Sequence, residues 1–150
     1  MAIINTDRLL LVEKVLILKS LSIFKDTPEN ILAELAPLME EEEYEQNTAI
    51  FKEGDFGDCM YIIYKGEVNI HKGNAVLAVL REKEVFGELS LLDAEARSAS
   101  ATSKTDCLLF RVNQEPFYEL LETRMEVVKG FIKILCQRLR AQNEKTSTAP

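Results

Sequence analysis

The residues best suited to chemistry lie in one short stretch, residues 86–92, and in the three residues at 97–99. Gly87 has no Cβ atom, so its backbone can approach a ligand closely. The free N–H groups at the start of a short helical turn over 88–92 would point at an anion. Arg97 adds a permanent positive charge and a planar set of donors that suits phosphate oxygens. We therefore expect this stretch to hold an anionic group.

Glu88 adds a second kind of recognition to the same stretch. An ionised carboxylate only accepts hydrogen bonds, so it suits a sugar hydroxyl and does not suit a phosphate. The alternative is that Glu88 and Arg97 pair with each other as a structural salt bridge. The flanking Gly87 and the short apolar helix favour a ligand that presents an anion and a hydroxyl together.

The motif Phe86-Gly87-Glu88-Leu89-Ser90-Leu91-Leu92, followed by Arg97-Ser98-Ala99, resembles the phosphate-binding cassette of cyclic nucleotide-binding domains. That family includes the regulatory subunits of cAMP-dependent kinase, the bacterial catabolite activator proteins and the cyclic-nucleotide-gated channels. The resemblance covers roughly residues 21–142. It implies that Glu88 binds the ribose 2′-hydroxyl and that Arg97 binds the cyclic phosphate. It also implies a cradle completed by Gly87, Leu89, Ser98 and Ala99.

The same resemblance proposes residues for the base end of the site. Ile70, Leu77 and Leu80 match positions that line the pocket in relatives, although packing in the core explains them equally well. Gln142 and Asn143 match a Thr-Ser pair that touches the base in the catabolite-activator type. Both amides carry a donor and an acceptor and could read a purine edge. A solvated helix end is the alternative for this pair.

The elements that must position these residues follow from periodicity and turn signals. Apolar spacing predicts helices over 8–19 and from a Thr27 cap to Glu40. Turn residues separate eight short strands in a β-roll over 43–112. The strand candidates are 43–46, 48–52, 59–64, 67–71, 75–80, 84–86, 98–103 and 106–112. Two C-terminal helices over 113–122 and 124–143 and a tail over 144–150 complete the prediction.

This arrangement predicts an α+β fold that is mainly β. We expect an eight-stranded jelly-roll-like β-barrel, flanked by N-terminal helices within 8–40 and by two C-terminal helices within 113–143. The 150 residues, of which 47% are hydrophobic, suit a single domain over 1–150.

Composition excludes several classes of function. The net charge of −7 argues against a direct nucleic-acid surface and against docking on anionic lipid. No apolar run approaches the ~20 residues of a membrane span, so no direct membrane insertion is expected. Three widely spaced cysteines and the single His71 disfavour a metal site and suit a reduced, cytoplasmic setting. The cytosolic domain of a larger membrane-associated protein is the alternative location.

No catalytic set emerges, because the sequence has no histidine–nucleophile–acid trio and no P-loop. We therefore expect a non-enzymatic regulatory module that binds a cyclic nucleotide, cAMP with cGMP as the alternative. It would relay occupancy through its C-terminal helices, form a homodimer through 124–143, and act on a fused or partner effector domain. The chain does not resemble a complete transcription activator, because no helix-turn-helix follows the last helix. The alternatives are a structural or dimerisation module that binds no nucleotide, and a fragment of a transcription regulator.

Overall fold

The computed structural model describes the backbone of residues 3–147 and the side chains of residues 11–145. Packing divides the chain into two compact units. A β-rich unit covers residues 37–118, and a helical unit combines the described residues up to 36 with those from 119 onward. The expectation of a single domain over 1–150 stays a prediction.

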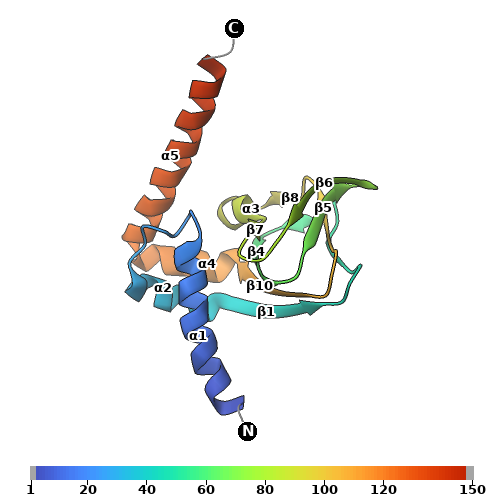
Figure 1. The fold of residues 1–150 in the computed structure, drawn as a ribbon. Coiled ribbons are helices and arrows are strands. Elements are labelled where there is room, and N and C mark those ends of the chain that lie inside the picture. The colour runs from blue at the N-terminus through green and yellow to red at the C-terminus, as the bar shows by residue number, and fades with distance from the viewer. Residues whose placement is uncertain (1–2, 148–150) are drawn as a thin grey trace. The chain divides into compact units, whose positions relative to one another are not determined.

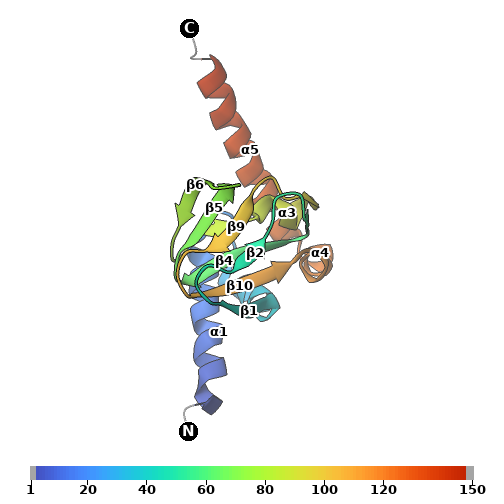
Figure 2. The same ribbon diagram turned by 90° about the vertical axis from the view of Figure 1, so that its right-hand side faces the viewer.

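The β-rich unit contains ten strands and one short helix, all labelled in Figure 1 or Figure 2 where space allows. The strands are β1 (Met39–Tyr44), β2 (Ala49–Phe51), β3 (Phe56–Gly57), β4 (Cys59–Lys65), β5 (Val68–Lys72), β6 (Ala75–Leu80), β7 (Val85–Phe86), β8 (Glu95–Ala96), β9 (Ser100–Ser103) and β10 (Cys107–Asn113). They form antiparallel sheets of order β1-β10-β4-β7, β2-β9-β5-β6 and β3-β8. Figure 2 shows the β2-β9-β5-β6 sheet with its strands side by side.

The predicted mainly-β jelly-roll fold is confirmed, and each of the eight predicted strands has a counterpart. The sheets are open, however, because each has two edge strands instead of closing into a barrel. The sequence did not predict β3 and β8. Both are only two residues long and show no apolar alternation, and neither contains two consecutive large apolar residues, as the equally short β7 does, so sequence pattern did not detect them.

Three features near the start of the roll differ from the prediction: the end of α2, the start of β1 and the N-cap of α2. The second helix, α2, spans Glu29–Leu35 and gives way to a 3₁₀ turn, η1, over Ala36–Leu38, instead of running to Glu40. Pro37 has no N–H to continue the helix. Residues 40–43, all glutamates, lie between the predicted helix end at Glu40 and the predicted strand start at 43, but the structure places all four inside β1, where they pair with β10. Pro28 takes the N-cap position of α2, so the predicted Thr27 cap is wrong.

The two larger sheets enclose an apolar core. Its buried members come from β4, β7 and β10 of one sheet and from β5 and β9 of the other: Cys59, Tyr61, Ile63, Val68, Phe86, Ala101, Cys107 and Leu109. Partly buried side chains pack against them, including Phe51 on β2. Alternation along β4 and β10 turns every second residue toward this core.

The helical unit contains α1 (Ile3–Ser20), α2 and α5 (Met125–Ser147), while α4 (Gln114–Thr123) begins in the β-rich unit. Phe24 meets Phe131 edge-to-face, with ring centroids 5.4 Å apart. Arg124 donates to the Glu34 carboxylate in an exposed ion pair.

Two helix ends differ from the prediction. α1 begins at Ile3 instead of residue 8. α5 continues through 144–147 of the expected tail, while 148–150 lie outside the described residues. None of the helices described is both long and apolar enough to cross a membrane.

Candidate functional site

The short helix α3 (Glu88–Leu92) follows a turn at Gly87 that requires a glycine. Gly87 follows β7 and holds φ +73°, ψ +19°, the left-handed region that favours glycine. The chain therefore turns sharply from the sheet into α3, and the Ser90 amide donates to the Gly87 carbonyl at 3.0 Å. The predicted strand–glycine–helix order is the one observed.

Backbone hydrogen bonds to the turn at residues 54–55 hold Arg97 in place. It directly follows β8, whose Ala96 pairs with Phe56 on β3. The Arg97 amide donates to the Asp55 carbonyl at 2.7 Å, and the Arg97 carbonyl accepts from the Gly54 amide at 2.8 Å. These two bonds fix where the Arg97 side chain leaves the loop.

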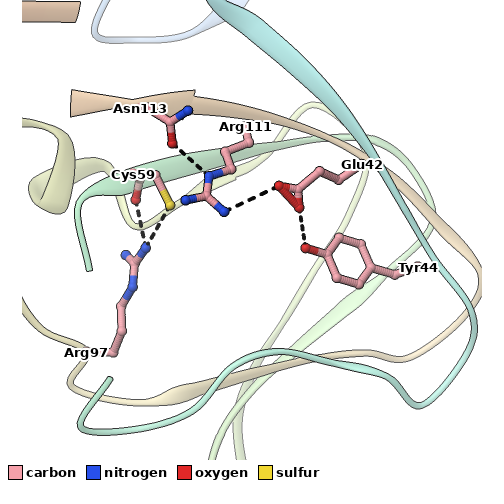
Figure 3. A network of polar contacts seen from close by, with 6 residues as sticks. All are labelled: Glu42, Tyr44, Cys59, Arg97, Arg111 and Asn113. Atoms are coloured by element: carbon pink, nitrogen blue, oxygen red, sulfur yellow. Dashed lines mark hydrogen bonds and ion pairs between the residues drawn. The ribbon is translucent and has the colours of Figure 1, made fainter. Parts of the chain in front are cut away.

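The Arg97 side chain is only 7% exposed and points at the start of β4 (Figure 3). Its Nη2 donates to the Cys59 carbonyl oxygen at 2.9 Å and lies 3.2 Å from the Cys59 Sγ. Its Nη1 donates to the Ser90 Oγ on α3 at 2.9 Å. The guanidinium carbon lies 4.2 Å from the centre of the Phe51 ring, in the geometry of a cation–π contact.

Two glycines make room for this guanidinium. A Cβ atom placed on Gly57 would lie 2.3 Å from the Arg97 Nε, and one placed on Gly87 would lie 2.6 Å from the Arg97 Nη1. Both distances are far below van der Waals contact. Gly57 and Gly87 are therefore required for the observed position of Arg97, and any larger residue must displace it.

The charge of Arg97 has no acidic partner within the described part of the chain. Arg97 takes no part in the ion pairs Arg81–Glu67, Arg111–Glu42, Arg124–Glu34 and Lys133–Asp26, which described residues form. The alternative of a Glu88–Arg97 salt bridge is therefore not realised. The Arg97 Nε is also buried without a hydrogen-bond partner. Because a buried charge and a buried unpaired donor are both costly, this site has unused capacity for an anion.

The other predicted cassette residues lie around Arg97 in chain order. Glu88 is the first residue of α3 and is half-buried, whereas Leu89 is 62% exposed. Ser98 is exposed and Ala99 is half-buried in the bend that leads to β9. The structure brings Gly87 against the Arg97 side chain. The binding roles given to Glu88, Leu89, Ser98 and Ala99 stay predictions.

The residues predicted for the base end are distributed differently. Ile70 on β5 and Leu80 on β6 are half-buried and pack against the apolar core. Leu77 on β6 is 58% exposed. Gln142 and Asn143 lie exposed on α5, in the helical unit. A pocket role for any of these five stays a prediction.

A second arginine, Arg111 on β10, belongs to a hydrogen-bonded polar group beside this site that includes the Glu42 carboxylate (Figure 3). Arg111 donates from Nε to the Asn113 Oδ1 at 2.7 Å and from Nη1 to the Glu42 Oε1 at 3.5 Å. The Tyr44 hydroxyl donates to the other Glu42 oxygen. Burial, followed by the hydrogen bond to Glu42, raises the pKa of Tyr44 above its ordinary value. Burial lowers the pKa of Arg111, but electrostatic interactions, among them the charge of Glu42 and the hydrogen bond to it, outweigh burial and raise that pKa overall.

The two arginines lie against a trio of aromatic rings, Phe51, Tyr61 and Phe86. Tyr61 stacks on Phe86 with ring centroids 5.1 Å apart, and Phe51 lies 6.0 Å from Tyr61 and 5.9 Å from Phe86. Arg97 covers Phe51, and the Arg111 guanidinium carbon lies 6.0 Å from the centre of the Tyr61 ring. Burial raises the pKa of Tyr61, which keeps its hydroxyl neutral.

Sequence reasoning missed four residues that contact or enclose Arg97. Phe51, Gly57 and Cys59 lie far from it in sequence, and no local signal marks them as neighbours of an arginine. The fourth, Ser90, lies within the cassette motif, but its side chain was given no role. Only a predicted pairing of 55–57 with the segment before Arg97 could have indicated Gly57.

Comparison with known proteins identifies the family. The family model of the cyclic nucleotide-binding domain matches residues 41–124, more than half of the chain. The cyclic AMP receptor protein of Thermus thermophilus is 36% identical over 102 residues, which cover 65% of this chain and 47% of that protein. The matched region covers 59% of the CRP-like regulator of Mycobacterium tuberculosis and 47% of the Thermus protein, but only 25% of the cAMP-dependent protein kinase regulatory subunit of Eremothecium gossypii.

Solved structures agree in fold. The N-terminal domain of a transcriptional regulator from Streptomyces coelicolor A3(2) superimposes with a TM-score of 0.82 at 29% identity, covering 89% of this chain and 96% of that one. The regulatory domain of Toxoplasma gondii PKA, crystallised with cAMP, superimposes with a TM-score of 0.68 at 32% identity, covering 73% and 44%. The motif around Gly87, Glu88 and Arg97, the jelly-roll fold and these matches agree: the chain belongs to the cyclic nucleotide-binding domain family.

Proposed function

We propose that this chain is a regulatory module whose β-roll binds a cyclic nucleotide, cAMP with cGMP as the alternative. Arg97 takes the cyclic phosphate, and Glu88 accepts from the ribose 2′-hydroxyl. Gly87, Leu89, Ser98 and Ala99 enclose the phosphate. The proposal is supported by relatives named as cyclic AMP receptor and cAMP-dependent kinase regulatory proteins and by the PKA regulatory domain crystallised with cAMP.

One observation carries the proposal. Arg97 is buried, has no carboxylate partner in the described residues and keeps its Nε unpaired. A cyclic phosphate would supply the missing negative charge and an acceptor for the remaining N–H groups. Arginine suits this task because its planar donors match phosphate oxygens.

The output of binding is proposed to pass through α4. The Gln114 amide, at the start of α4, donates to the Asp58 carbonyl at 2.8 Å, next to the Cys59 that holds Arg97. The Tyr118 hydroxyl donates to the Leu92 carbonyl at the end of α3. α4 is thus bonded to both segments that hold the Arg97 guanidinium. A ligand that prefers one arrangement of these segments would shift the helices that follow.

A homodimer is proposed to form through α5. Met125, Ile132 and Leu139 are spaced by seven residues and are 60%, 55% and 62% exposed. Leu135, four residues before Leu139, is 41% exposed. This is the heptad spacing of a two-stranded coiled coil, and a second copy of the helix would cover it. Leu135→Glu with Leu139→Glu should convert a dimer to a monomer in analytical ultracentrifugation; a wild-type monomer at all concentrations would contradict this.

Calorimetry tests the binding proposal. Titration with cAMP and with cGMP should give heat and one binding site per chain for at least one of them. Arg97→Ala should weaken that affinity about a hundredfold or more, because the phosphate loses its charged partner. The exposed Arg81, paired with Glu67, offers a matched control, and Arg81→Ala should bind like the wild type.

The opposite result has a definite meaning. No heat from either nucleotide at high micromolar concentration would exclude nucleotide binding. The chain would then be the structural or dimerisation module that the sequence left as the alternative.

A further inference from the structure

The hydroxyl of Ser90 lies where it can control the arginine at the proposed phosphate site. Ser90 is on α3, and its Oγ accepts a hydrogen bond from the Arg97 Nη1 at 2.9 Å. The Ser90 amide donates to the Gly87 carbonyl at 3.0 Å. The backbone of Ser90 is therefore held within α3, and its side chain joins this helix directly to the guanidinium.

We propose that Ser90 is a positioning residue that orients Arg97 and adds a hydroxyl donor beside it for the ligand's anionic oxygen. This inference rests on the proposed binding of a cyclic nucleotide. It goes beyond the phosphate contacts of Arg97, because it assigns a role to a side chain that the sequence motif left without one.

The hydrogen-bonding capacity of the hydroxyl supports this role. A serine hydroxyl carries one donor and two acceptor lone pairs. One lone pair takes the Arg97 N–H, and within the described residues the Ser90 hydroxyl makes no bond as a donor. Its proton is therefore available next to the cation. An anionic oxygen at this place could accept from both groups, whereas another cation could accept from neither.

The surroundings of Arg97 explain why its orientation needs fixing. Cys59 holds only the Nη2 end of the guanidinium, and Phe51 supports its face. The Nε has no partner. The bond to Ser90 is the one that holds the Nη1 end. Without the bond to Ser90, the Arg97 guanidinium can rotate over the Phe51 ring, and its N–H groups lose their fixed direction toward a ligand.

Calorimetry of four proteins with cAMP tests the role: the wild type, Ser90→Ala, Ser90→Thr and Ser100→Ala. Ser90→Ala should weaken the affinity about tenfold, since it removes hydrogen bonds to charged groups. Ser90→Thr keeps the hydroxyl and should stay within about threefold of the wild type. Ser100 is the matched control, because its Oγ accepts from the Glu53 amide and does not contact Arg97. Ser100→Ala should bind like the wild type.

A second background separates positioning from a general structural effect. Arg97→Lys keeps the charge and removes the Nη1 group, so Ser90→Ala should cost much less than tenfold in that background. An equal loss in both backgrounds would overturn the positioning of Arg97 by Ser90, because that role requires the Nη1 group. Ser90→Cys, which nearly keeps the volume, provides a second test if Ser90→Ala does not fold, and should bind more weakly than the wild type.

The outcomes distinguish this inference from the function on which it rests. If the wild type binds cAMP and Ser90→Ala binds within twofold of it, only the role of Ser90 is wrong. If the wild type binds neither cAMP nor cGMP, both are wrong.

Discussion

Two arginines of the β-rich unit lie against one aromatic trio, and they differ in what balances their charge. Arg111 contacts the Glu42 carboxylate and the Asn113 side chain, and its side chain is 34% exposed. Arg97 is 7% exposed, contacts only neutral groups and keeps its Nε unpaired. The more deeply buried cation is thus the one with less compensation. Figure 3 shows both guanidinium groups and the Glu42 carboxylate that pairs with only one of them.

The difference separates a structural arginine from one adapted to a ligand. A buried charge is stable when it is paired and hydrogen-bonded, as Arg111 is. Leaving Arg97 without an acid costs stability in the free protein. It also leaves attraction for an incoming anion that an internal carboxylate would otherwise satisfy. The same type of residue therefore serves two purposes, according to the acids that the fold brings to it.

Exchanging each arginine for lysine should give the largest contrast. Arg97→Lys should weaken cAMP affinity by about a hundredfold, because a lysine cannot present the planar donors that suit phosphate. Arg111→Lys should change it by less than about threefold, since Arg111 is already paired within the sheet. Calorimetry measures both. Equal losses would show that the two arginines do not divide their roles in this way.

Gly57→Ala should disturb only the ligand-binding arginine. The added Cβ would meet the Arg97 Nε at 2.3 Å, and Gly57 is not in the left-handed region, so backbone strain is not the cause. We expect cAMP affinity to fall about tenfold or more as the guanidinium is displaced from its place. In an Arg97→Ala background the same change should cost almost nothing. A similar loss in that background would point to a general distortion of the roll.

Replacing each arginine with methionine should affect stability in the opposite order to affinity: without ligand, the loss at Arg111 should exceed the loss at Arg97. Arg111→Met should lower the free energy of unfolding by about 2 kcal/mol, because it leaves the half-buried Glu42 carboxylate with the Tyr44 hydroxyl but without its cationic partner. Arg97→Met should lower it by about 1 kcal/mol or less, because losing an uncompensated charge offsets the lost hydrogen bonds. Urea denaturation measures both, with the exposed Arg81→Met as control. A larger loss for Arg97 would contradict the comparison.

Among the arginines compared, Arg124 of the helical unit should contribute least to stability, because its ion pair with Glu34 is exposed. The hydrogen bond from Arg124 lowers the pKa of the Glu34 carboxyl. A lowered pKa means that the pair stabilises the fold above the ordinary pKa of glutamate, and that this contribution is lost as pH falls through the lowered value. Glu34→Gln should therefore cost a small, salt-sensitive amount at neutral pH and nothing in strong acid. A difference that persists at the lowest pH would show that the pair is not its source.

Much of the fold followed from local pattern. Turn residues and short apolar runs predicted eight of the ten strands, and apolar spacing predicted α1, α4 and α5, because period and turn chemistry are properties of neighbouring residues. The two-residue strands β3 and β8 were missed, although they position Arg97. The β1 boundary was also missed, because an acidic run at 40–43 resembles a helix end until β10 pairs with it.

The sequence by itself determined the chemical types in the site and their local geometry. Gly87 must turn the chain, Glu88 must begin a helix, and Arg97 must bring a cation nearby, and each of these follows from residues close in sequence. Only the tertiary structure decided which cation is compensated. Cys59 meets Arg97 across 38 residues, and Glu42 meets Arg111 across 69. Contacts over such separations depend on which strands pair and in what register, and that is decided when the whole roll closes around its core.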